Sequence, residues 1–350
     1  MSQYLVRRIL WMIPTLFFVT LITFIIMRST PGGPWDTNPD SRQNDPRIQA
    51  ALNKQYGLDK PLYFNPEKAQ EVATAGGNPL QVTQAFFDGQ YFNFLTNLTR
   101  GKLGPSYRFR GRQVEDVLLE PSPGRPAYQN RVTTTFMLGI IAMSLALLVG
   151  FPLGLIAGLK QNTVVDNVSL LVATIGFGIP SFILGIYLII LFSRVLKVVD
   201  VLNFDYWDNW TAWLLPAACL AIPTSAFVAR LTRTSVIEVM RQDYIRTARA
   251  KGLHERLVIF RHILRNAMIP VVTFIGPALA GLVTGSFIIE QQFSVEGIGR
   301  LFVESINRRD YGVILSLTLL YAFLVAFANL GVDVVYGFLD PRIKVGGKGK

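Results

Sequence analysis

The chain has 350 residues, of which 51% are hydrophobic and only 16% charged, and its mean hydropathy is +0.36. An ordinary soluble domain has about 25% charged residues, and several apolar runs here approach the roughly 20 residues that cross a bilayer. Composition therefore argues against a soluble enzyme and against a disordered chain. The net charge of +11 does not indicate nucleic acid binding, because an excess of Lys and Arg is typical of the cytoplasmic side of membrane proteins.

Six apolar runs predict six transmembrane helices in an all-α polytopic membrane protein. They cover Ile9–Met27, Phe136–Leu159, Val168–Phe192, Trp213–Leu231, Ile269–Ile289 and Val313–Gly337. A signal peptide is the alternative for the first run, but residues 29–34 offer no small-residue cleavage site. We therefore expect an uncleaved first span.

The distribution of charge predicts that both termini are cytoplasmic. Sixteen Lys and Arg fall in the four segments that this topology places inside, which are residues 1–8, 160–167, 230–268 and 340–350. The two short outer loops, 193–212 and 290–312, hold five Lys and Arg and seven Asp and Glu. The basic excess inside agrees with the rule that Lys and Arg of short loops stay in the cytoplasm.

Four parts follow from these spans: an N-terminal helix over 1–28, an extracytoplasmic segment over 29–131, a five-helix core over 132–340, and a basic tail over 341–350. We call residues 29–131 the outer segment. It is rich in Pro and Gly turns, and one short helix is expected over Asp45–Tyr56, where Ile48, Leu52 and Tyr56 share a face. We expect a cap with no core of its own.

Motifs for catalysis and cofactor binding are missing from the sequence. There is no phosphate-binding loop with Gly-Lys-Ser or Gly-Lys-Thr, and no HExxH. The two histidines, His254 and His262, are eight residues apart, which is a poor spacing for a metal site. The single Cys219 lies in an apolar run and should be a small buried side chain. We therefore expect no catalytic residue, metal or cofactor in this chain, and no ATPase activity.

Residues 230–268 form a basic segment with an unusual pattern. Helical spacing through Val236, Val239 and Met240 breaks at Gly252. A second helix can follow, with Leu257, Phe260 and Leu264 on one apolar face. Small residues, Ala248 and Ala250, precede the glycine and would let another protein approach closely. A basic hairpin held by anionic lipid is the alternative, but it does not account for the small residues.

This segment resembles the EAA loop of permease subunits in binding-protein-dependent ABC importers. The loop sequences TARAKG at 247–252 and RHILRNAMIP at 261–270 are similar to the first permease of the peptide/nickel (oligopeptide–dipeptide) group. Further similar stretches are the opening VRRILWMIPTLFFVTLITFIIMRSTPG, RGKLGPSYR at 100–108, QQFSVEGIGRL at 291–301, RRDYGVI at 308–314 and LDPRI at 339–343. Arg246 replaces the Glu of the general motif and Arg265 its Pro, and residues 65–90 and 121–130 resemble insertions into the usual outer loop.

The resemblance implies a type I ABC importer-like permease in a bacterial or archaeal cytoplasmic membrane. Its expected partners are a second homologous permease, two ABC ATPase subunits, an extracytoplasmic substrate-binding protein and the lipid bilayer. The implied ATPase-coupling residues are Arg246, Thr247, Ala248, Ala250, Gly252, Leu253 and Leu257. Candidate residues lining the pathway are Gly176, Pro180, Ser181, Gly276, Gly281 and Gly285.

Short peptides are the implied substrate. Oligosaccharides and a nickel chelate are alternatives within the same class of transporter. A non-transport membrane scaffold or an intramembrane enzyme is the alternative of another class.

Overall fold

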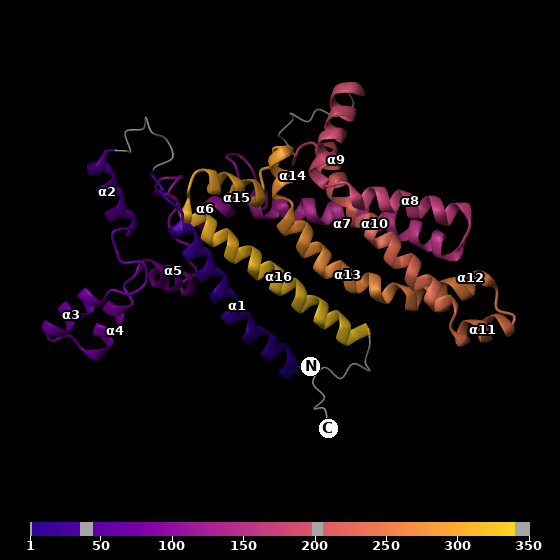
Figure 1. The fold of residues 1–350 in the computed structure, drawn as a ribbon, viewed down its shortest axis with the longest axis horizontal. Coiled ribbons are helices and arrows are strands. Elements are labelled where there is room, and N and C mark those ends of the chain that lie inside the picture. The colour runs from indigo at the N-terminus through magenta and orange to yellow at the C-terminus, as the bar shows by residue number, and fades with distance from the viewer. Residues whose placement is uncertain (1, 36–44, 198–205, 340–350) are drawn as a thin grey trace. The chain divides into compact units, whose positions relative to one another are not determined.

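The structure is a computed structural model that describes residues 2–35, 45–197 and 206–339 (Figure 1). Within these residues there is no β-strand, which confirms the all-α expectation. The α-helices are α1 (Ser2–Ser29), α2 (Pro46–Tyr56), α3 (Pro66–Thr74), α4 (Pro79–Phe86), α5 (Gln90–Thr99), α6 (Val114–Leu119), α7 (Arg131–Leu159), α8 (Val164–Gly178), α9 (Ser181–Ile189), α10 (Leu214–Met240), α11 (Asp243–Ala250), α12 (Glu255–Leu257), α13 (Leu264–Gly285), α14 (Phe287–Gln292), α15 (Ile298–Asn307) and α16 (Tyr311–Leu339). Two π-helical turns, η2 (Ile190–Val195) and η4 (Val258–Ile263), and a 3₁₀ turn, η3 (Trp210–Trp213), complete them.

The chain divides into two compact units. The first contains residues 1–11, 132–300 and 323–350, and the second contains residues 12–131 and 301–322. The second unit therefore joins the outer segment to the adjoining parts of α1 and α16. The basic tail predicted over 341–350 lies outside the described residues.

The predicted spans correspond to helices that are long and apolar enough to cross a membrane. Among the described residues there are five such segments: Val6–Ser29, Arg131–Leu159, Trp210–Met240, Glu255–Thr284 and Tyr311–Gly331. The remaining predicted span corresponds to the pair Val164–Gly178 and Ser181–Val195, which is bent by 97°. Counted as one span, this pair brings the total to the expected six.

The third predicted span, Val168–Phe192, is divided into two helices, α8 and α9, that meet at a bend. The chain leaves the helix at Ile179, whose φ of −92° and ψ of 122° are extended. Pro180 follows, and proline disfavours helical geometry in the residue before it and lacks an amide hydrogen of its own. The bend is therefore built into the sequence Gly178-Ile179-Pro180.

The Gly-xxx-Gly-xxx-Gly pattern of α7 packs directly on the backbone of α10. A methyl group built on Gly150 would lie 2.4 Å from the Ser225 carbonyl oxygen, and one on Gly154 would lie 2.3 Å from that of Ala229. Gly158 meets Val236 one turn further, at 2.8 Å. Only glycine permits this approach, so the pattern is a packing ridge, as small-residue repeats between membrane helices usually are.

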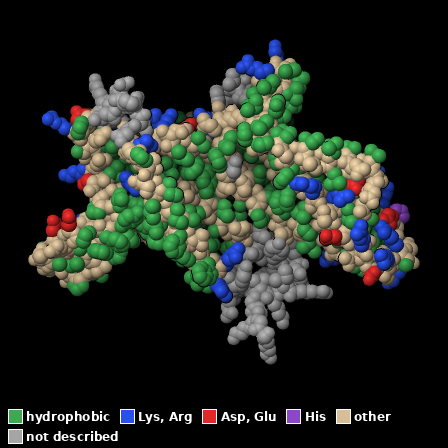
Figure 2. All heavy atoms as spheres, viewed as in Figure 1, with side chains coloured by type: hydrophobic (Ala, Val, Ile, Leu, Met, Phe, Trp, Pro, Cys, Tyr) green, Lys and Arg blue, Asp and Glu red, His purple; other side chains and the backbone are tan. Residues whose placement is uncertain are grey.

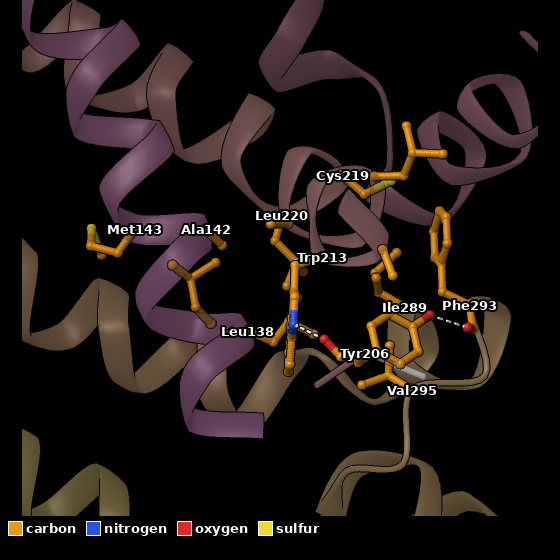
Figure 3. Close-up of a cluster of buried hydrophobic side chains, with 14 residues drawn as sticks. Leu138, Ala142, Met143, Tyr206, Trp213, Cys219, Leu220, Ile289, Phe293 and Val295 are labelled. Atoms are coloured by element: carbon orange, nitrogen blue, oxygen red, sulfur yellow. Dashed lines mark hydrogen bonds between the residues drawn. The ribbon is translucent and has the colours of Figure 1, made fainter. Parts of the chain in front are cut away.

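Further along the first unit, a buried cluster joins α7, α10 and α14 (Figure 3). Trp213 donates its indole N–H to the Tyr206 carbonyl oxygen at 2.5 Å, and the Tyr206 hydroxyl donates to the Phe293 carbonyl. Cys219 is buried beside them as a free thiol, which confirms the expectation for this residue. The polar tips of the aromatic residues are thus paired inside an apolar core.

The outer segment contains more structure than its sequence suggested. The expected helix is present as α2, where the Asp45 side chain accepts a hydrogen bond from the Arg47 amide. Four further helices, α3 to α6, were not predicted. The outer segment shares a core with the ends of two spans. Tyr91 packs in one cluster with Phe24 of α1 and Tyr311 of α16, and its hydroxyl oxygen lies 3.0 Å from that of Thr20.

We predict that Gly154→Val lowers the thermal stability of the purified full-length chain by about 1–3 kcal/mol, as overpacking does. The added methyl groups cannot fit between α7 and the α10 backbone. Gly281→Val is the matched control, because a side chain there meets open space. Equal melting of both variants would show that the ridge does not set the helix spacing.

Candidate functional site

The candidate coupling residues lie in the segment between α10 and α13, here called the α10–α13 loop (residues 241–263). α10 does not stop at Leu231, where the apolar run ends, but continues to Met240. The chain then folds into α11, turns, and returns through α12 and η4 into α13. In Figure 1, α11 and α12 lie side by side at the end of α10. The loop is therefore carried on two spans without an intervening linker.

One side of the loop has its own small core. Ile245 and Ala248 of α11 are buried against Val258 and Ile263, together with Val236 of α10. Ala248 is only 5% exposed, so its small size serves packing within this chain. This core fixes α11 rigidly to the ends of α10 and α13.

The turn after α11 requires glycine. Gly252 has φ of +75°, and its amide donates to the Arg249 carbonyl at 2.9 Å, while the Leu253 amide donates to that of Ala248 at 3.4 Å. This is the Schellman arrangement that ends many helices at a left-handed glycine. Arg249 also binds Glu255 through two hydrogen bonds, at 2.7 and 3.2 Å, which close the turn from α11 to α12.

The opposite side of the loop is exposed. Of the candidate residues, five are exposed and Leu253 is half-buried; the exposed ones are Arg246, Thr247, Ala250, Gly252 and Leu257. The structure adds Phe260, which is 71% exposed, and Tyr244, which is 41% exposed and whose hydroxyl accepts a hydrogen bond from the Asn266 amide at 2.7 Å. Sequence reasoning placed Phe260 on an apolar face and so missed it. Figure 2 shows Lys and Arg gathered over this end of the molecule with a few acids among them.

The candidate pathway residues whose surroundings the structure describes lie in different environments. Gly176 packs on Ile222 of α10, and Pro180 and Ser181 lie at the bend between α8 and α9. Gly276 lines an apolar cavity of about 440 Å³ between α7, α13 and α16, whereas Gly281 is exposed with open space beside it. The surroundings of Gly285 lie outside the described residues. The assignment of these residues to a pathway stays a prediction.

A buried acid that sequence reasoning missed organises the QQFSVEGIGRL stretch. Glu290 is fully buried and accepts hydrogen bonds from the hydroxyls of Ser286 (2.6 Å) and Thr135 (2.9 Å) and from the amides of Gly299 (2.8 Å) and Arg300 (3.0 Å). Burial raises the pKa of the Glu290 carboxyl, and these hydrogen bonds oppose the rise. A methyl group on Gly297 would lie 2.3 Å from the carboxylate, so only glycine fits beside it. An acid followed by Gly-x-Gly was therefore the feature of the sequence that could have indicated this contact.

In the second unit, Asp310 joins two stretches that are 200 residues apart. Its buried carboxylate accepts hydrogen bonds from the Ser106 hydroxyl at 2.5 Å, from the amides of Tyr107 and Arg108 at 3.1 Å, and from the Val313 amide at the start of α16. RGKLGPSYR and RRDYGVI therefore meet at one carboxylate. The described contacts therefore give both stretches a role in folding.

Comparison with known proteins identifies the class. Residues 150–345 match the family described as binding-protein-dependent transport system inner membrane component. The dipeptide transport system permease protein DppB of Bacillus subtilis is 36% identical over 349 residues, covering 100% of both chains. The oligopeptide transport system permease proteins OppB of Haemophilus influenzae and of Escherichia coli K12 are each 34% identical, covering 98% of this chain and 100% of theirs. The chain is thus a membrane subunit of an ABC importer, and it belongs to the binding-protein-dependent inner membrane component family.

We predict that Gly252→Val loosens α11. A left-handed conformation costs a non-glycine residue about 1–2 kcal/mol, and the Schellman hydrogen bonds should weaken with it. Amide hydrogen exchange of residues 243–250 in the full chain should quicken. Gly178→Val is the control, because that glycine has open space and no positive φ. Unchanged exchange in Gly252→Val would contradict the role given to the turn.

Proposed function

We propose that this chain is the first permease of an ATP-driven importer of short peptides, in the cytoplasmic membrane of a bacterium or archaeon. The observation that carries the proposal is the end-to-end similarity to permeases named for dipeptide and oligopeptide transport. A second homologous permease would supply the other half of the pathway. Two ATPase subunits would supply the energy, and an extracytoplasmic binding protein would deliver the peptide.

The α10–α13 loop is the proposed contact with an ATPase subunit. Its exposed residues, among them Ala250 and Phe260, would enter a groove of the partner, while Ile245 and Ala248 hold α11 to the spans. α10 is a single helix of 27 residues, about 40 Å long at 1.5 Å per residue. A push on α11 would therefore move α10 and α13 as a rigid body, which is a common way to transmit a conformational change.

This mechanism places the loop and both termini in the cytoplasm, in agreement with the distribution of Lys and Arg. In a Cys219→Ala background, Thr247→Cys should react with a membrane-impermeant thiol reagent only after cells are permeabilised. Thr99→Cys, at the exposed end of α5, should react in intact cells. The reverse pattern would refute the orientation.

Peptide uptake is the direct test of the substrate. Cells lacking the gene should lose uptake of labelled di- to pentapeptides and regain it with the intact gene, but not with a gene carrying Gly252→Val. Uptake of labelled oligosaccharides and of nickel, measured in the same cells, should not change. Loss of oligosaccharide or nickel uptake with peptide uptake intact would overturn the peptide assignment and keep the transporter class. No change in any uptake would favour a scaffold.

A further inference from the structure

A cavity of about 620 Å³ lies in the second unit, where α1 ends and α16 begins. Its volume is within the range of about 300–1,000 Å³ that small-ligand sites occupy. Phe24 and Met27 of α1, Phe94 of α5 and Leu315 of α16 form the apolar part of its wall. The membrane-crossing segments Val6–Ser29 and Tyr311–Gly331 both have an end here. Insertion of these two segments in a bilayer would place the cavity where hydrocarbon gives way to headgroups.

The polar part of the wall is cationic. Arg28, Lys54, Lys60 and Arg100 line the cavity, and no Asp or Glu does. Lys60 binds Asp88 at 2.6 Å, but in the part of the chain that the structure describes no ion pair involves the other three. Arg28, Lys54 and Arg100, three cations with no ion pair among the described residues, therefore favour an anion in this cavity.

Arg28 is held in place with hydrogen-bonding capacity left over. It donates to the Gln90 side-chain oxygen, and that amide is oriented because its nitrogen donates to the carbonyls of Leu58 and Lys60 at 3.0 and 2.6 Å. The guanidinium also lies over the rings of Phe24 and Tyr311, 5.5 and 5.1 Å from their centroids. Its Nε is buried without a partner. A fixed guanidinium of this kind suits a phosphate, which accepts several such hydrogen bonds.

The buried carboxylate of Asp310 makes no ion pair with a cation of the cavity wall in the described part of the chain. It is not part of the cavity wall, and its oxygens already accept hydrogen bonds from Ser106, Tyr107 and Arg108. A peptide is a poorer occupant than a lipid, because its ammonium group would need an acid that the wall lacks. A phospholipid matches both halves of the wall: its phosphate the cations, and its acyl chain the side chains of Phe24, Met27 and Leu315.

We propose that this cavity binds one anionic phospholipid, with the phosphate at Arg28 and Arg100 and an acyl chain along Phe24, Met27 and Leu315. The bound lipid would join α1, α5 and the start of α16 within this unit. None of the candidate pathway residues lines this cavity, and the proposal does not depend on which substrate is carried.

Lipid retention by the purified full-length chain tests the proposal. Samples in detergent are given phosphatidylglycerol, phosphatidylcholine, inorganic phosphate or an acidic dipeptide, and bound molecules are counted by native mass spectrometry. One phosphatidylglycerol should bind in preference to phosphatidylcholine. Arg28→Gln and Arg100→Gln should each weaken its binding about tenfold, the loss expected for one charge-assisted contact. Arg110→Gln removes the same charge from an exposed position of the same unit outside the cavity, and should bind normally.

The Arg100→Gln variant should fold normally, because the Arg100 side chain is exposed and lies outside the packed cluster around Tyr91. A loss of lipid in this variant would therefore not reflect misfolding. Equal retention of phosphatidylglycerol by all three variants and the unaltered chain would overturn the proposal. Saturable binding of inorganic phosphate without lipid would assign the site to a free anion and overturn the lipid. Displacement of phosphatidylglycerol by the dipeptide at stoichiometric amounts would assign the cavity to substrate, and would also overturn it.

Discussion

The close approach of α7 to α10 is the contact on which the first unit depends. Lipid tails are as apolar as leucine, so membrane helices associate through tight packing and polar pairs rather than through the hydrophobic effect. Gly150, Gly154 and Gly158 supply the tight packing. A buried ion pair adds to it near one end: Arg233 of α10 binds Asp166 of α8 through two hydrogen bonds, at 2.5 and 2.8 Å. α10, fixed in this way, packs in turn against α8, α9, α13 and α14 and carries the α10–α13 loop at its end.

Two buried carboxylates hold segments together where the chain is not helical. A buried charge is tolerated only when hydrogen bonds satisfy it, and Glu290 and Asp310 each accept at least four. Each holds the start of a helix, α15 and α16 respectively, against a distant part of the same unit. The stretches around Glu290 and Asp310 that resemble the importer family therefore have a role in folding.

The sequence predicted the features that rest on composition and on backbone chemistry. Long apolar runs located the spans. Gly252 marked a turn because glycine adopts a positive φ without steric cost. Helices α3 to α6 were missed because short, mixed segments carry little periodicity and gain their stability from tertiary packing. α3 and α4 pack against each other, and α5 packs with α1 and α16. The burial of Ala248 and the exposure of Phe260 were also missed. An apolar pattern identifies one face of a helix. Which face of α11 is buried depends on the cluster formed by Val236, Val258 and Ile263, which the pattern does not show. Which residues of the α10–α13 loop are buried and which are exposed is thus set by tertiary packing.

In the proposed complex, the exposed side of α11 touches an ATPase subunit while its buried side holds the spans. Cross-linking tests this contact, with a single cysteine placed at Ala250 or at Ala248 in the Cys219→Ala chain, assembled with the proposed ATPase subunits. We predict that a cysteine at 250 forms a cross-link to an ATPase subunit whose yield changes between ATP and ADP, whereas one at 248 forms none. An assembled complex that imports substrate but gives no cross-link at 250 in either nucleotide would contradict the account.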